Sequence, residues 1–530
     1  MEEDFQNVAK TAWDLSANRP FHSRTTNLAG TLKRWCKKKK PIQQQLDTLQ
    51  QQINSIQMQP IQEQDHSLEV KLIAQYEENM TKLTEFYRQR AKKHWATHGD
   101  RNTSFFHNAV LKRKRRNRIV SINDTNGNNL FDPEDIAREF VDYFKNIFQS
   151  LCPNYDRPLN TSHPQDEQDF TNSIPDKQEV WEILKSMRRN ASPGPDGFNV
   201  GFYISAWSWI GEDVTNVVRN FYITGKLPPR LNETHIVLIP KKLVCHVPSD
   251  FRPISLCNVV YKIIAKSLAN RLKPHLPDYI HPSQQAFIEG RRISNNIIVA
   301  QEISHSFSLS SWNGIDFMLK IDLAKAFDRI EWHFIASALE RKGLDDHFIN
   351  LIYSCISSPT FSVIINGQSF AHFKSSRGIR QGCPLSPALF VLAVNELSLA
   401  LHDALQANHL SGISLGPDCP PIHSLMFADD LLVCGKANVQ EAATISHILQ
   451  QFCHQSGQLP NWNKSGIMFS KKVNLQVRQD IKRIFPVPDI DHNTIHLGHP
   501  LILPARERQI SGVQLRLRQI QIKTLRLQSQ

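Results

Sequence analysis

The stretch LMFADDLLVC at residues 425–434 places two adjacent carboxylates, Asp429 and Asp430, inside an apolar run. The apolar residues on both sides predict a β-hairpin that carries the two acids at its tip. Two close carboxylates repel each other, and removing them from water is costly. A bound divalent cation would relieve both costs. The alternative is an exposed hairpin tip whose acids are simply solvated.

A third acid favours the metal-binding interpretation. Asp322 lies in FMLKIDL (317–323), which has the pattern of a buried strand. A carboxylate at a strand end, facing the hairpin tip, can help to hold two Mg²⁺ ions through oxygen ligands. Two ions about 4 Å apart would stabilise the attacking and leaving oxygens of a phosphoryl transfer. The other acidic pair, Asp345-Asp346, follows Gly343 at an expected helix start, where acids suit the helix dipole.

The composition is that of a globular, basic protein. The chain has 530 residues, 40% of them hydrophobic, and a formal net charge of +12. Such a charge favours a polyanionic partner, usually nucleic acid, although a merely basic soluble protein would have the same composition. The nine cysteines form no CxxC pair, the N-terminus is polar, and the apolar run at 388–394 is too short to span a bilayer. We therefore expect an intracellular protein, in nucleus or cytoplasm, with no secretory or transmembrane segment.

The hydrophobic patterns predict an α+β fold after a helical N-terminal extension. Short strands are expected at 236–241, 361–367 and 424–427. The Gln-rich segment 43–64, with apolar residues at heptad-like spacing, predicts a helical hairpin or a short coil.

Two basic clusters, LKRWCKKKK (32–40) and KRKRRNR (112–118), could contact phosphates. For the first cluster, a solvated helix face is the better interpretation. In the second, Arg113, Arg115 and Arg116 are the candidate nucleic-acid contacts.

The segment RGIRQGCPLSPALF (377–390) predicts a tight turn before a helix. Gly378 and Gly382 allow close backbone approach, and Pro384 and Pro387 hold the bend. Such a turn suits an anion or a nucleotide.

In their order along the chain, eight stretches resemble the reverse-transcriptase domain of LINE-type (non-LTR) retrotransposons, most closely the plant kind. They are SPGPDGF (192–198), DFRPISLCNVVYKIIAKSLANRL (250–272), QQAFIEGRRISNNI (284–297), KIDLAKAFDRIEW (320–332), RGIRQGCPLSP (377–387), FADD (427–430), SGQLPNWNKSGIMFS (456–470) and HLGHPLI (496–502). WATHGDRNTSFFHNA (95–109) resembles the family's segment before the polymerase.

The resemblance implies a right-hand polymerase fold with palm and fingers. It implies an RNA-directed DNA polymerase that adds dNTPs to a primer 3′-hydroxyl with two Mg²⁺ ions, Mn²⁺ being possible, and that uses an RNA template and a DNA primer. We expect a helical extension at 1–130, an upstream fingers-side region at 131–240, fingers and palm at 241–505, and a divergent tail at 506–530. Oligomeric state is left open.

The resemblance also assigns roles to individual residues. Asp322, Asp429 and Asp430 match the metal ligands, and Lys464 matches a lysine that could protonate pyrophosphate. The positions expected to contact the incoming nucleotide are Lys241, Arg252, Phe327, Gln381 and Gly382, with Phe327 matching the gate that excludes a ribose 2′-hydroxyl. The alternatives are an ordinary core ring for Phe327, solvated side chains for Lys241 and Lys464, a structural ion pair for Arg252 and a plain turn for Gln381.

The sequence also departs from the family pattern. Pro460 stands where a strand residue is usual, which predicts disturbed strand pairing there. After ARER (505–508) the chain becomes rich in Gln, Leu and Arg, so we expect a chain truncated at both ends, without a thumb or an endonuclease. Two other hypotheses stay open: a catalytically silent relic that only binds nucleic acid, and a maturase-like reverse transcriptase.

Overall fold

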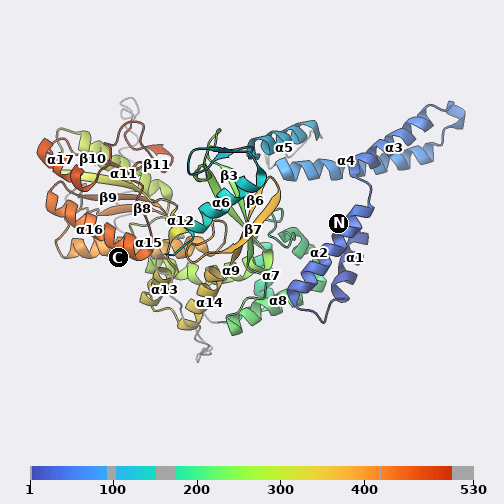
Figure 1. Cartoon of the computed structure of the whole chain (residues 1–530), viewed down its shortest axis with the longest axis horizontal. Helices are drawn as coiled ribbons and strands as arrows, with labels where there is room; N and C mark the ends of the chain where they lie inside the picture. The colour runs from blue at the N-terminus through green and yellow to red at the C-terminus, as the bar shows by residue number, and fades with distance from the viewer. Residues whose placement is uncertain (1–2, 92–102, 151–172, 417–418, 504–530) are drawn as a thin grey trace.

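The structure is a computed structural model that describes residues 3–91, 103–150, 173–416 and 419–503. Two four-stranded β-sheets lie beside each other, each with its own helices. A pair of helices within residues 42–91 projects away from them (Figure 1). We call the sheet that contains Asp322 and Asp430 the palm sheet and the other one the fingers sheet. The helix-and-strand mixture is the α+β fold expected from the hydrophobic patterns.

The palm sheet has four antiparallel strands in the order β10-β5-β9-β8. They are β5 (Asp316–Asp322), β8 (Ser424–Phe427), β9 (Asp430–Lys436) and β10 (Gly466–Phe469). Strand β5 is central and almost wholly buried, which explains its nearly continuous apolar sequence. Strands β8 and β9 form the expected hairpin, closed by the two-residue turn Ala428-Asp429.

Helices cover both faces of the palm sheet. Phe317, Leu319 and Ile321 of β5 point into the main core, which includes buried residues of α13 (Trp332–Arg341), α15 (Ser386–Gln406) and α16 (Val439–Ser456). Met318 points to the other face and packs with α11 (Ile293–Ser308). This alternation follows from the two-residue period of a strand. Only the strand ends and the connecting loops remain open for a site.

The fingers sheet has the order β4-β3-β6-β7. Its strands are β3 (Glu233–Pro240), β4 (Phe251–Cys257), β6 (Thr360–Ile365) and β7 (Gln368–Lys374). One face packs on α6 (Pro133–Ile147) through a separate core that includes Phe140, Phe144, Ile236 and Val363. Because β7 continues through the loop 375–385 into α15, this loop joins the two sheets.

Three helices lie below the fingers sheet and share the main core with the palm: α7 (Lys177–Lys185), α8 (Val200–Thr224) and α9 (Val259–Leu272). Helices α1 (Glu3–Asp14) and α2 (Phe21–Lys38) dock on α8, where Asp213 accepts hydrogen bonds from Trp13 and Arg24 at 2.8 and 2.7 Å. Helices α1 and α2 are therefore part of the packed body.

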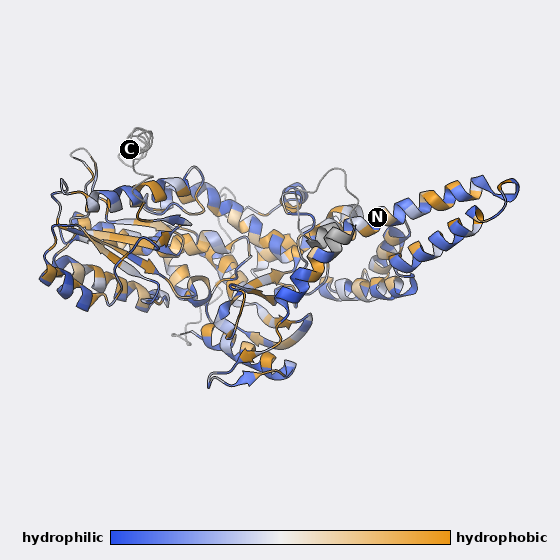
Figure 2. Ribbon diagram, turned by 90° about the horizontal axis from the view of Figure 1, so that it is seen from above, coloured by the Kyte–Doolittle hydropathy of each residue, from blue (hydrophilic) through white to orange (hydrophobic). Residues whose placement is uncertain are grey.

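Helices α3 (Ile42–Gln57) and α4 (His66–Ala91) form an antiparallel hairpin that extends away from the rest of the molecule (Figure 1). Leu46, Leu49, Ile53 and Ile56 are the buried residues of α3. The segment 43–64 thus takes part in a helical hairpin, but it supplies only the first helix and the turn, and the second helix follows it. Hydrophilic residues alternate with hydrophobic ones along the ribbon of both helices (Figure 2). Helix α5 (Thr103–Asn117) carries the second basic cluster and lies near β3.

The remaining elements are short or peripheral. The helices are α10 (Leu276–Tyr279), α12 (Ala326–Arg329), α14 (Asp346–Ser357) and α17 (Leu475–Ile484), with 3-10 turns at Ile61–Glu63, Pro248–Asp250 and Lys273–His275. The strands β1 (Ile122–Asn123) and β2 (Asn129–Leu130) form one ribbon, and β11 (Ile495–His496) and β12 (His499–Pro500) form another.

The expected disturbance at Pro460 is wrong. Pro460 forms an antiparallel bridge with Leu323. The hydrogen bonds of this pairing run from the amide of Ala324 to the carbonyl of Leu459, at 2.8 Å, and from the amide of Asn461 to the carbonyl of Asp322, at 2.7 Å. A proline is tolerated because the pairing uses the amides on either side and none at position 460.

Two other expectations have structural outcomes. Asp345 is the N-cap of α14 and accepts hydrogen bonds from the amides of His347 and Phe348, which confirms its structural role. Among the described residues, α15 is the one helix long and apolar enough to cross a membrane, and 67% of its most apolar window is buried in the protein. The expected tail 506–530 lies outside the described residues, and the proposed domain boundaries stay predictions.

Candidate active site at the end of the palm sheet

The three predicted metal ligands meet at one edge of the palm sheet. Asp322 is the last residue of β5, and its direct antiparallel partner is Asp430, the first residue of β9. Residues paired in this way have their Cβ atoms about 5 Å apart. Asp429 is next to this pair, in the turn between β8 and β9. Residues far apart in sequence are therefore brought together as predicted.

The turn has an unusual backbone that is held from below. Ala428 has a φ of 55°, in the left-handed region that non-glycine residues rarely adopt. Its amide donates a 3.0 Å hydrogen bond to the side-chain oxygen of Gln284, which is fully buried. The segment around Gln284 also pairs with β8 at Met426. This support fixes the direction in which Asp429 leaves the sheet.

The pKa values of Asp429 and Asp430 are both raised. Although Asp429 is exposed at the tip, the protein around its carboxyl group raises the pKa, and the charge of Asp322 raises it further. Burial also raises the pKa of Asp430. Lys320 opposes this shift, whereas the charges of Asp429 and Asp322 increase it. The group thus concentrates negative charge, and a cation bound there would relieve the repulsion.

Basic side chains surround the acids. The ammonium group of Lys320 lies 3.9 Å from Asp430 and that of Lys464 lies 3.9 Å from Asp322. Lys320 is 9% exposed and Lys464 is 69% exposed, so the first is a fixed part of the floor and the second is open to solvent. Arg252, exposed on β4, lowers the pKa of Asp429. Among the described residues Arg252 makes no ion pair, which leaves it available at the mouth of the site.

A second group of residues lies where the fingers meet the palm. Lys325 has a φ of 54°, and burial, with the nearby charge of Lys241, lowers its pKa to about 8. Lys464 contributes to the same shift, whereas Asp328 opposes it. The predicted residues Lys241 and Lys464 therefore both lie near Lys325, a residue that sequence reasoning missed.

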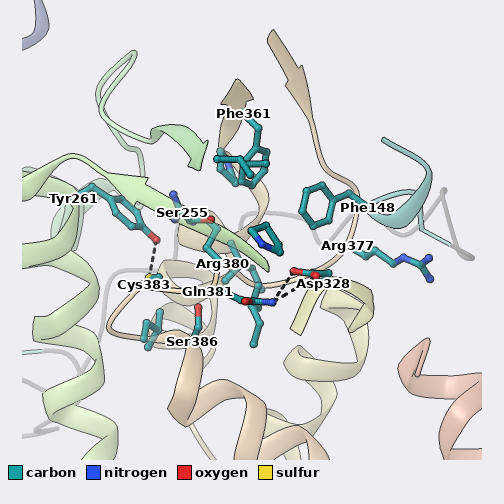
Figure 3. A pocket seen from close by; sticks show the side chains of 17 residues that line it. Phe148, Ser255, Tyr261, Asp328, Phe361, Arg377, Arg380, Gln381, Cys383 and Ser386 are labelled. Carbon is teal, nitrogen blue, oxygen red and sulfur yellow. Dashed lines mark hydrogen bonds between the residues drawn. The ribbon is translucent and has the colours of Figure 1, made fainter. Parts of the chain in front are cut away.

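Figure 3 shows how the loop 377–386 packs at this junction. The side-chain amide of Gln381 points to Asp328 and donates to its two oxygens at 3.4 and 3.5 Å. The carbonyl of Gln381 accepts a 2.9 Å hydrogen bond from the amide of Ser255 on β4. Gly378 is needed because a Cβ there would lie 2.5 Å from the carbonyl oxygen of Asp328, and at Gly382 one would lie 3.1 Å from that of Ser255. The loop is a close-packed joint, as its glycines predict.

The cavity drawn in Figure 3 is only about 20 Å³, which is room for a water molecule and not for a base. Arg380 closes it from below, stacking on Tyr261 at 4.1 Å and donating to the carbonyl of Cys355. A nucleotide would therefore have to lie above this joint, on the side of the acids.

Phe327 lies at the same junction, on α12. Its ring is half-buried and stacks on Phe390 of α15, with centroids 4.4 Å apart and an angle of 15° between the planes. The ring thus belongs to the core on one side, and its exposed part is available to a ligand.

Comparison with known proteins identifies this arrangement. Residues 239–501 match the family model described as reverse transcriptase (RNA-dependent DNA polymerase). This segment is a reverse-transcriptase domain. It contains β4 through β12 and the loop that joins the two sheets. All the residues expected to bind metal or nucleotide, from Lys241 to Lys464, lie in it.

The relatives of the reverse-transcriptase domain are proteins of non-LTR retrotransposons. The transposon TX1 149 kDa protein of Xenopus laevis is 28% identical over 372 residues, which is 69% of this chain and 28% of that protein. The Pol polyproteins of R2 elements from Popillia japonica and Nasonia vitripennis are 27% and 28% identical, over 52% and 51% of this chain and 37% and 25% of theirs. The chain thus spans less than two fifths of each relative.

These matches confirm the expected fold and kinship of the reverse-transcriptase domain. The relatives come from a frog and from insects, so they give no support to the narrower expectation of a plant-type element. A telomerase structure from Candida albicans aligns over 47% of this chain and 45% of that chain, at 15% identity and a TM-score of 0.33, which is too low to support an argument.

Three supporting residues of the reverse-transcriptase domain were not found by sequence reasoning. The place of Lys320 could have been predicted, because it stands two positions before Asp322 in the same strand and its side chain must point to the same face of the sheet. The sequence does not predict the roles of Gln284 and Lys325. The role of Gln284 depends on a non-local pairing, and that of Lys325 depends on a left-handed backbone.

Arg113, Arg115 and Arg116 lie apart from the acids. They are exposed on α5, whose end is anchored to the turn between β6 and β7 by hydrogen bonds between Ile119 and Asn366. The basic cluster therefore lies on the outer side of the fingers sheet.

Proposed function

We propose that this chain is an RNA-directed DNA polymerase that adds dNTPs to the 3′-hydroxyl of a DNA primer on an RNA template and releases pyrophosphate. The observation that carries the proposal is the pairing of Asp322 with Asp430, beside Asp429, within a reverse-transcriptase domain. Within the described part of the chain, the ion pairs of Asp430 and Asp322 are long, at 3.9 Å each, and Asp429 has none.

The donor set fits divalent metal ions. Three carboxylates offer only hard oxygen ligands, which Mg²⁺ prefers and Mn²⁺ accepts. The raised pKa values of Asp429 and Asp430 mark a group that gains from an added cation. Two bound Mg²⁺ ions would lower the pKa of the primer hydroxyl and neutralise the triphosphate. We propose that Asp322, Asp429 and Asp430 hold them.

The surrounding residues then divide the work of binding the nucleotide. Lys241, Lys325 and Lys464 supply a row of positive charge suited to a triphosphate, and Lys464 is close enough to the acids to give a proton to the departing pyrophosphate. Arg252 adds charge from the fingers sheet. Phe327 presents a ring edge to the sugar, while Gln381 and Gly382 hold the loop beneath it.

Template and primer would be bound mainly through phosphates, and the exposed arginines of α5 offer one such contact. We place the activity inside the cell, in nucleus or cytoplasm, where RNA templates and dNTPs are present. The second candidate function is nucleic-acid binding without catalysis. The intact acid cluster, with its buried support from Gln284, favours the active enzyme.

Primer extension on poly(rA)/oligo(dT) with Mg²⁺ tests the proposal. Asp322→Asn, Asp429→Asn and Asp430→Asn should each lower the rate by roughly 10³-fold or more, because metal binding contributes several kcal/mol to the transition state. Asp345→Asn is the matched control, since asparagine is an equally good N-cap for α14.

Circular dichroism of all four variants should match the wild type. No extension by the wild-type chain, together with retained binding of primer-template, would establish the binding-only alternative. Equal losses in the control and the three site variants would remove the assignment of the acids.

A further inference from the structure

Three histidines meet at the edge of the palm sheet, outside the polymerase site. His281 follows α10, His402 is on α15 and His423 directly precedes β8. Their ring centroids are 4.8 Å apart for His281 and His402, 5.1 Å for His281 and His423, and 5.7 Å for His402 and His423. We propose that these three histidines bind one transition-metal ion of the zinc class.

The ring nitrogens have the right spacing. One nitrogen from each ring lies within 4.8 Å of the other two. Tetrahedral zinc with Zn–N distances of about 2.0 Å places its ligand nitrogens about 3.4 Å apart, so small ring rotations close the site. Three imidazoles from three separate elements are a common ligand set for zinc, and they are poor ligands for Mg²⁺.

The remaining ring nitrogens are held in ways that suit metal ligands. Nδ1 of His281 lies 2.9 Å from the hydroxyl of Ser283, and Nδ1 of His423 lies 2.9 Å from that of Ser424. These contacts fix the planes of the two rings, as the outer partners of metal-bound histidines do. At His281 the amide of Ser283 also donates to Nδ1, at 3.2 Å, so coordination through Nε2 needs this ring to turn away from that amide. Burial lowers the pKa of both rings, to about 4 and about 3, so that they are neutral at pH 7.

A cavity of about 230 Å³ adjoins the cluster and leaves a fourth position open. Its lining includes all three histidines, the thiol residue Cys419 and apolar side chains of α11 and α15. A water molecule can therefore complete the coordination from this side. No carboxylate of the described residues belongs to the cluster, which favours a metal that accepts nitrogen ligands alone.

A bound ion would stabilise the support of the polymerase turn. The segment after His281 pairs with β8: Ser283 accepts a 2.9 Å hydrogen bond from Met426, and Gln285 donates one of 3.0 Å to it. Gln284, between them, binds the amide of Ala428. An ion at the histidines would tie α15, this segment and β8 to one point, at the end of β8 opposite the acids.

Cobalt substitution tests the site directly. Co²⁺ is titrated into the full chain with Mg²⁺ in excess, and the visible absorption of tetrahedral cobalt is recorded. The wild type should bind one equivalent. His402→Asn should lose at least about 100-fold in affinity, since removing a ligand costs more than removing its outer hydrogen-bond partner. The matched control is His409→Asn, which replaces an exposed histidine a few residues along the chain.

A second background separates this site from the carboxylates. The double variant Asp429→Asn/Asp430→Asn should keep the tetrahedral cobalt signal and the rise in Tm that Zn²⁺ produces. A signal lost in that variant but kept by His402→Asn would place the metal at the acids and overturn the proposal. Absence of cobalt binding by the wild type at neutral pH would also overturn it. Because the readouts are metal binding and Tm, failure of the polymerase assay does not affect them.

Discussion

Phe327 shows how one ring can belong to both the core and a site. Its stacking on Phe390 fixes the plane of the half-buried ring, so the part of the ring that remains exposed keeps one orientation. A sugar pressed against a fixed edge is discriminated by shape, and a methyl-sized change matters because interiors are close-packed.

Phe327→Val should raise incorporation of ribonucleotides relative to deoxyribonucleotides, by roughly 10-fold or more, because the space for a 2′-hydroxyl opens. The ratio of kcat/KM for rNTP and dNTP measures this. Phe334→Leu changes a buried ring of α13 that pairs with Phe452 and is the control: it should lower stability without a comparable change in the ratio. An unchanged ratio in both variants would make Phe327 an ordinary core residue.

Asp328 gives a pH dependence of stability. It is 3% exposed, and burial raises its pKa to about 6. The folded state therefore holds the proton more tightly than the unfolded state, in which the pKa is near 3.8. Stability should fall as the pH rises from about 4 to about 6 and should then level off, at a cost of roughly 2 to 3 kcal/mol.

Asp328→Asn keeps an oxygen for Gln381 but has no proton to lose. Its Tm should exceed that of the wild type at pH 7 and approach it near pH 4, as followed by thermal unfolding at several pH values. Asp403→Asn, at an exposed acid on α15, should leave the profile unchanged. Parallel profiles for Asp328→Asn and the wild type would contradict the prediction.

Among the elements, the β8–β9 hairpin was predictable and its support was not. Alternation around FADD predicts strand, turn and strand, because the period of the pattern is local. The pairing of Gln284 with Met426 joins residues more than a hundred positions apart, and no local pattern specifies it. The effect of Pro460 is also non-local. Proline has no amide hydrogen to donate, and whether this disturbs the pairing depends on which amides the bridge with the partner segment uses.

The site follows the same division. Asp322, Asp429 and Asp430 could be predicted because each stands at the end of a strand with a clear pattern or in the turn beside one. Lys325 could not, because a left-handed lysine beside Lys241 arises only when the end of β3 meets α12 in three dimensions. Burial, which sets the pKa of such groups, is a property of the assembled core.

Helix α5 is expected to bind the phosphates of the primer-template through its arginines. Changing Arg113, Arg115 and Arg116 to Gln should weaken primer-template binding and should flatten the slope of log K against log salt by up to about one unit per lost phosphate contact. The matched control changes Lys37, Lys38 and Lys40, exposed residues at the end of α2, to Gln. Equal slopes in the two triple variants would mean that α5 contributes only general charge.

On the scale of the whole molecule, one buried ion pair joins fingers and palm. Arg377, in the loop after β7, lies 3.4 Å from Glu331 at the start of α13, and the two side chains are 3% and 2% exposed. Arg377 also donates to the carbonyl of Ile147 at the end of α6, at 2.8 Å. Ser150 donates to the other oxygen of Glu331, at 2.6 Å. This polar contact therefore ties the loop after the fingers sheet to α6 and to the start of α13.

Removing one partner should leave the other charge buried and unpaired. Arg377→Met should therefore cost about 3 to 5 kcal/mol, whereas Arg377→Met/Glu331→Gln should cost less than the sum of the single changes. Arg483→Met, in the exposed pair with Asp480, should cost no more than about 1 kcal/mol. Denaturant unfolding of the four variants measures these differences, and additive losses would show that the pair is not coupled.

The α3–α4 hairpin affects how the molecule behaves in solution. By helix rise alone, α3 and α4 reach about 24 and 39 Å, and Figure 1 shows them extending away from the body. Such an arm adds little mass but increases friction, so a 60.8 kDa monomer should sediment slowly and elute early from a gel-filtration column. An early elution volume is therefore expected of a single copy, and mass measured by light scattering is the quantity that reports whether copies associate.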